Sequence, residues 1–227
     1  MTIQKLVILS MLSLLTYEMK IQQVLAHPVT YQDGIALSII NQKQMSLWHT
    51  NYSFNARFAA GIEYTRFGSE SPSRFGLGRV NVLLKRWLGE GRQGNIYMFG
   101  GLGSGQLSDE RDLKTGQSQQ YPLVAMIGAQ ADYETQTFYT AFIGRALIDH
   151  EHLDRPRYYH LLYRVGFAPY VSKVNHLQSW FVVQMTYMNE QERPSLVALM
   201  RFFHRTALWE IGADTEGHPW VHLMAHF

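Results

Sequence analysis

The feature that most constrains the fold is a succession of segments in which apolar and polar residues alternate. In 194–204, for example, Leu196 and Ala198 share one phase, whereas Arg201 lies in the other. A period of two places successive side chains on opposite faces of an extended strand. Beyond the amino-terminal region, no segment shows a helical period over enough residues to cover a sheet. The sequence therefore predicts an all-β protein.

The alternating segments are separated by clusters of Gly, Pro, Asn, Asp and Ser, which are turn-forming residues. We expect about twelve strands, within a range of about ten to fourteen. Most are about nine to thirteen residues long, the length of a tilted bilayer crossing, whereas strands of soluble domains are usually shorter. The expected strands are 34–40, 46–54, 58–66, 75–87, 94–106, 121–133, 137–149, 158–170, 177–188, 194–204, 207–214 and 219–227.

Longer and shorter connections alternate along the chain. The longer set is polar and charged, as in 108–120 (SDERDLKTGQSQQ) and 150–157 (HEHLDRPR). The shorter set includes 55–56 and 205–207, with 88–93 (LGEGRQ) as an exception that is longer than a two-residue turn requires. Long loops on one rim and tight turns on the other are typical of bacterial outer-membrane β-barrels, and an even strand number returns both termini to the tight-turn rim.

In the expected strands 121–133, 158–167, 194–204 and 207–214, one face carries no charged residue. In 158–167, Leu161 and Val165 belong to the uncharged phase and Arg164 to the other. In a soluble sandwich or lipocalin-like barrel the charged face would point outward to water. The inverted arrangement is favoured because Tyr and Trp concentrate near strand ends, where an interfacial girdle of a membrane barrel lies. These aromatic residues are Trp48, Tyr52, Tyr64, Trp87, Tyr133, Tyr159, Tyr170, Tyr187, Trp209 and Trp220.

The first 26 residues differ from the rest. Lys5 precedes an apolar stretch from Leu6 to Leu15, and the small residues Val24 and Ala26 follow, which is typical of a cleaved signal peptide. We therefore expect a leader over 1–26 and a single barrel domain over 27–227. The chain contains no cysteine, so an exported fold of this size depends on backbone hydrogen bonds rather than on disulfides. Scattered basic residues and a formal net charge of +2 give no indication of nucleic-acid binding.

The last strand carries an alternating apolar pattern that ends on an aromatic residue: Val221, Leu223, Ala225 and Phe227. This pattern resembles the carboxy-terminal signature of Gram-negative outer-membrane β-barrel proteins. The resemblance implies an antiparallel up-and-down transmembrane barrel in the outer membrane, in contact with lipid and lipopolysaccharide and inserted by the barrel-assembly machinery. Because backbone groups facing hydrocarbon must be paired, we expect 219–227 to close the barrel against 34–40.

Charged residues on the polar faces would then line the lumen. The residues predicted to do so are Glu63, Arg79, Lys85, Asp132, Arg145, Arg164, Arg201, Glu210 and Asp214. One interpretation is a structural barrel filled by an internal ion-pair network. The other is a narrow passive channel for small solutes, in which the basic excess favours anions.

The sequence leaves two further functions open, copper handling and lipid modification. Soft thioether and imidazole ligands suit copper, and the candidate ligands are His27, His222, Met224 and His226. No other cofactor is indicated. A lipid-modifying barrel enzyme would need a serine and a histidine on the lipid-facing wall. Ser195 and His160 fall instead in the inward phase, and the loop that begins at His150 combines acids with imidazoles that a solvated surface also explains.

Overall fold

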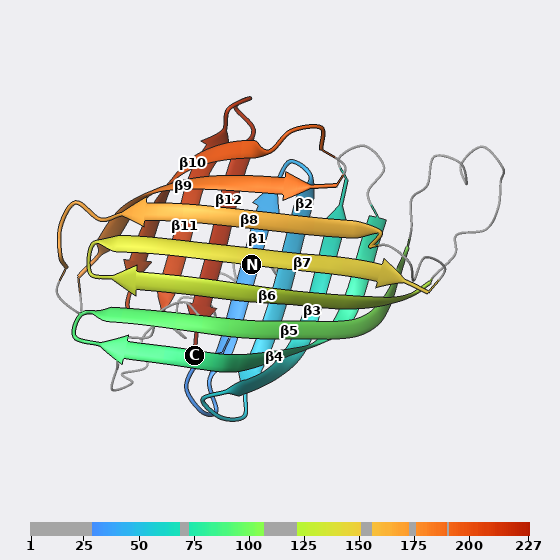
Figure 1. Cartoon of the computed structure of the whole chain (residues 1–227), viewed down its shortest axis with the longest axis horizontal. Helices are drawn as coiled ribbons and strands as arrows, with labels where there is room; N and C mark the ends of the chain where they lie inside the picture. Colours follow the sequence, from blue (N-terminus) through green and yellow to red (C-terminus); the bar gives the residue numbers. More distant parts are fainter. Residues whose placement is uncertain (1–28, 69–72, 107–121, 151–155, 173–175, 190) are drawn as a thin grey trace, which may run out of the picture.

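The computed structural model describes residues 29–68, 73–106, 122–150, 156–172, 176–189 and 191–227 (Figure 1). The expected leader and His27 lie outside these residues. The described part of the chain contains no helix long and apolar enough to span a membrane. Its strands are β1 (Ile35–Gln42), β2 (Met45–Ser53), β3 (Phe58–Phe67), β4 (Ser73–Gly89), β5 (Arg92–Gln106), β6 (Leu123–Thr135), β7 (Phe138–Asp149), β8 (Tyr158–Phe167), β9 (Gln178–Met188), β10 (Ser195–His204), β11 (Ala207–Asp214) and β12 (Pro219–His226).

These twelve strands form a closed antiparallel barrel in which every strand pairs with its neighbours in sequence. In Figure 1, β4–β9 lie in front and cross the strands of the rear wall, as expected for a barrel with tilted strands. β12 pairs with β1 in a register that places His226 opposite Ala36 and Val221 opposite Asn41. The predictions of an all-β up-and-down barrel, of about twelve strands and of closure between the first and last strands are confirmed.

The apolar phase of the strands faces outward. On β8, Leu161 is 41% exposed whereas Arg164 is only 5% exposed, and on β9 Val183 is 59% exposed. The other phase buries acids, amides and arginines, which a barrel in water would turn outward. A soluble sandwich or lipocalin-like barrel is therefore excluded by the side-chain arrangement. Trp220, expected in the interfacial girdle, is 1% exposed and lies inside with the inward phase of β12.

Three two-residue turns, 90–91, 136–137 and 205–206, lie at the rim where β1 begins and β12 ends, together with the ten-residue connection 168–177. The connection 88–93, expected to be longer, is a two-residue turn at Glu90 and Gly91, because β4 and β5 continue up to it. Gly91 has φ of 62°, a left-handed conformation that glycine adopts without a Cβ clash. We call this end of the barrel the terminal rim and the opposite end the loop rim.

A β-bulge between Leu83 and Lys85 changes the phase of β4. Lys85 is exposed, and its Nζ lies 5.9 Å from the ring centroid of the outward-facing Trp87. Arg86 takes the inward position and donates hydrogen bonds to Asn95 at 2.8 Å and to the Tyr97 hydroxyl at 3.1 Å. The prediction that Lys85 lines the lumen is therefore wrong, because one extra residue in the strand moves every later side chain to the opposite face.

Candidate functional site

Two buried carboxylates organise the interior of the barrel, and each is shared by two arginines. The first hub is Glu63 on β3, which is 2% exposed. It accepts hydrogen bonds from Arg79 on the adjacent strand β4, from Arg145 at 3.0 Å and from the Thr65 hydroxyl at 2.8 Å. Arg145 belongs to β7, four strands away around the barrel. The first hub therefore ties two walls together across the lumen.

The second hub is Glu210 on β11, which is 1% exposed. Nη1 of Arg164 lies 3.0 and 3.3 Å from its two carboxylate oxygens, and Nε of Arg201 donates to Oε1 at 2.5 Å. Nδ1 of His222 is 2.9 Å from Oε2, and Nε2 of the same ring is 3.0 Å from the Ser38 hydroxyl. Each hub combines two guanidinium groups with one carboxylate, so each carries a net positive charge.

Each of the four hub arginines also lies over an aromatic ring. The distances from guanidinium carbon to ring centroid run from 4.0 to 5.5 Å. Such cation–π contacts are worth about 0.5–2 kcal/mol and fix the plane of the guanidinium group. The pairs are Arg79 with Phe99, Arg145 with Phe67, Arg164 with Trp220 and Arg201 with Tyr139.

A cavity of about 440 Å³, here the first cavity, runs between the two hubs. It reaches the terminal rim, where Gly91 and Gln136 line it, and all four hub arginines form part of its wall. At its inner end it reaches Met45, the first residue of β2 after the turn at the loop rim. The first cavity therefore extends through most of the height of the barrel.

A second cavity, of about 530 Å³, lies at the loop rim and is lined by polar residues that include Gln191 and Asp214. One apolar cluster contributes Met45 to the first cavity and Met188 to the second, and Ile40 packs against this cluster and against another that contains Trp180 and Trp220. We call Ile40, Met45, Met188 and Trp220 the apolar barrier.

The remaining sequence-predicted lumen residues lie away from the hubs. Asp132 is buried and accepts hydrogen bonds from Asn95 at 2.6 Å and from Gln130 at 3.1 Å. Asp214 lies at the loop rim rather than at mid-height. Sequence reasoning missed Arg86, because nothing in the local pattern marks the bulge that turns it inward. It also missed Glu134, which lines the first cavity.

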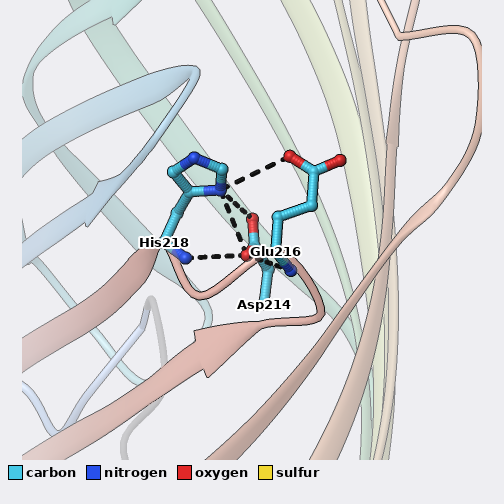
Figure 2. Close-up of side chains that lie close together, drawn as sticks. All are labelled: Asp214, Glu216 and His218. Carbon is cyan, nitrogen blue, oxygen red and sulfur yellow. Dashed lines mark hydrogen bonds and ion pairs between the residues drawn. The ribbon is translucent and has the colours of Figure 1, made fainter.

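One group of side chains in the described residues has metal-ligand spacing: Asp214, Glu216 and His218, whose ligand atoms lie within 4.8 Å (Figure 2). Oδ1 of Asp214 accepts backbone hydrogen bonds from Glu216 at 2.9 Å and from His218 at 2.8 Å. Nδ1 of His218 lies 3.0 Å from Oδ2 of Asp214. These contacts are those of an aspartate that caps its own turn between β11 and β12.

The predicted copper ligands are not brought together by the described structure. Both ring nitrogens of His222 have hydrogen-bond partners in the second hub. Met224 lines the first cavity, and His226 is buried beside Ala36 of β1. Copper binding stays a prediction because His27 lies outside the described residues.

The enzyme alternative has little structural basis in the described residues. His160 is 5% exposed and faces the lumen, and Ser195, at the start of β10, borders the second cavity. The acidic and imidazole-bearing loop that begins at His150 lies largely outside the described residues.

The architecture now defines the class of protein. An antiparallel barrel closed on itself, with an apolar outer wall and a lumen of paired charges, meets the requirements of a bilayer. The chain therefore has the fold of a transmembrane β-barrel. The apolar phase of β12, with Leu223 48% and Phe227 41% exposed, faces the lipid side as the carboxy-terminal signature implies.

Comparison with known proteins gives only distant structural likenesses. No family model and no curated protein matches the sequence. Among solved structures, a KdgM porin aligns with 9% identity and a TM-score of 0.45 over 86% of this chain and 98% of the porin. OmpT, an outer membrane protein of Vibrio cholerae, aligns with 8% identity and a TM-score of 0.30 over 91% of this chain and 99% of OmpT.

Proposed function

We propose that the protein is exported to the outer membrane and acts there as a narrow channel for small solutes. The observation that carries this proposal is the first cavity, which runs from the terminal rim between the hubs to Met45. A barrel that serves only as a scaffold fills its interior with side chains. Here the interior keeps a passage whose wall combines apolar side chains with the four hub arginines, and it stops at the apolar barrier.

The apolar barrier is the step that limits passage. Ile40 lines the first cavity and packs against both apolar clusters, so a solute that leaves the first cavity toward the loop rim must displace it. Hydrophobic constrictions of this kind stop ions and water until they widen. The channel is therefore expected to conduct weakly and only when the barrier opens.

A paired substitution on β1 tests this proposal. Ile40→Ala shortens the side chain at the barrier, whereas Ile39→Ala removes the same atoms from the neighbouring outward position, which is 38% exposed. In planar bilayers we expect Ile40→Ala to raise single-channel conductance several-fold over the unmodified protein, and Ile39→Ala to leave it unchanged. No conductance from either variant at any voltage would exclude the channel.

A further inference from the structure

Three buried polar nitrogens on one wall of the first cavity have no hydrogen-bond partner within the protein. They are Nε of Arg145, Nε of Arg164 and Nε2 of His160. The three residues are only 5–8% exposed, and all of them line the first cavity. A buried donor left without a partner costs about 1–3 kcal/mol, and more when it is charged. A group in the cavity that accepted hydrogen bonds from these nitrogens would remove this cost.

The two hubs explain why these nitrogens are left over. Nη1 of Arg145 binds Glu63 and Nη1 of Arg164 binds Glu210, so the terminal nitrogens are engaged while each Nε–H is not. A ligand can therefore accept from both Nε–H groups without displacing either glutamate. Because each hub keeps a net positive charge, an acceptor with a negative charge is favoured over a neutral one.

The three residues occupy neighbouring places on the lumen wall. Arg145 of β7 and His160 of β8 are register partners, and adjacent partners of this kind have Cβ atoms about 4.5–5.5 Å apart. Arg164 follows on the same face of β8, about 13 Å further along by strand rise, a gap that two long arginine side chains can narrow. In the tautomer that is protonated at Nε2, His160 adds a third hydrogen-bond donor. The set suits the oxygens of a small anion.

We propose that the first cavity contains an anion-binding site formed by Arg145, Arg164 and His160, which accepts carboxylate or phosphate groups. This proposal rests on the proposed function in one respect: in a channel, the anion site would determine which solutes pass. The acidic side chains of Asp132 and Glu134 line the same cavity. Ordered water is the competing occupant, since a cavity with several polar side chains in its wall also holds water.

Binding measurements on the full mature protein in detergent micelles distinguish these occupants. Inorganic phosphate and acetate, titrated separately at constant ionic strength and followed by calorimetry, are the probes. His160→Leu removes one donor and leaves every hydrogen bond of both hubs in place. We expect it to weaken phosphate binding at least tenfold. The matched control His218→Leu, in the exposed turn at the loop rim, should bind as the unmodified protein does.

Two results would overturn the anion site. One is the absence of heat for both probes with the unmodified protein, as expected if water alone fills the cavity. The other is equal affinity in the unmodified protein and in both His160→Leu and Arg145→Gln. Arg145→Gln keeps a polar side chain and still removes the Nε–H donor, so it tests the site independently of His160.

One experiment tests the proposed anion site and the proposed channel separately. In a potassium chloride gradient across a bilayer, the sign of the reversal potential reports whether anions or cations pass preferentially. Conductance without anion preference contradicts the anion site and leaves the channel intact. Phosphate binding in micelles together with silence in bilayers supports the anion site and contradicts the channel.

Discussion

Ile35 and Phe227 exchange two backbone hydrogen bonds, each 2.9 Å long, at the seam of the barrel. The amide of Ile35 donates to the carbonyl of Phe227, and the amide of Phe227 donates to the carbonyl of Ile35. This reciprocal pair completes the pairing of β1 with β12. Backbone groups within hydrocarbon cannot be left unpaired, so the seam is what makes the sheet compatible with a bilayer.

The ring of Phe227 is expected to matter for assembly more than for stability. It is 41% exposed on the outer wall, so Phe227→Ala keeps both seam hydrogen bonds and leaves the lumen untouched. We predict that the refolded variant unfolds in urea near the midpoint of the unmodified protein, whereas the folded fraction in bacterial outer membranes falls several-fold. Gel mobility with and without heating measures both. The control is Phe181→Ala, another outward ring, which should assemble normally; an equal loss there would refute a specific signal.

Glu210→Gln is predicted to destabilise the barrel strongly. The substitution leaves Arg164 and Arg201 buried without their shared carboxylate. Removing one partner of a buried ion pair costs about 3–5 kcal/mol. The measurement is the urea midpoint in detergent, with Asp214→Asn at the loop rim as the control. Equal midpoints for the two variants would show that water in the first cavity replaces the glutamate at no cost.

The outward position of Val183 predicts a depth-dependent penalty for charge. Val183 lies in the middle of β9 and is 59% exposed, whereas Leu177 precedes β9 at the terminal rim and is 43% exposed. Arginine on the lipid face costs about 2–4 kcal/mol at the bilayer midplane and about 0–1 kcal/mol near the interface. Val183→Arg should therefore lower stability in lipid vesicles far more than Leu177→Arg. The reverse order would mean that this face does not meet hydrocarbon.

Two glycines on paired strands predict opposite responses to alanine. A Cβ atom at Gly103 of β5 would lie 1.9 Å from the carbonyl oxygen of Gly76 on β4, so the strands must shift to admit it. A Cβ atom at Gly76 itself would have no atom within 4 Å. We expect Gly103→Ala to cost about 1–3 kcal/mol, as overpacking does, and Gly76→Ala to be neutral or slightly stabilising. Thermal unfolding of the two variants in the same detergent measures the difference.

Much of this fold was predictable from the sequence because strand alternation is a local property. Leu161 and Arg164 alternate on β8 as the sequence predicts, and the expected pairing of the terminal strands is confirmed. The phase of β12 also held the signal that Trp220 faces inward, since it alternates with Val221 and shares its face with His222. Trp220 is an aromatic residue near a strand end, which favours the girdle, but its position in the alternation of β12 places it inside.

The alternation of apolar and polar residues is a local property of each strand. It determined the strand number, the inward and outward faces and the closure of the sheet. The tertiary structure alone decided which inward charges meet. Arg145 reaches Glu63 from a strand 82 residues later in the chain, and the bulge in β4 exchanges Lys85 for Arg86. Contacts across the lumen depend on the register and curvature that all the strands acquire together when the barrel closes. The alternation of residues within one strand therefore cannot predict these contacts.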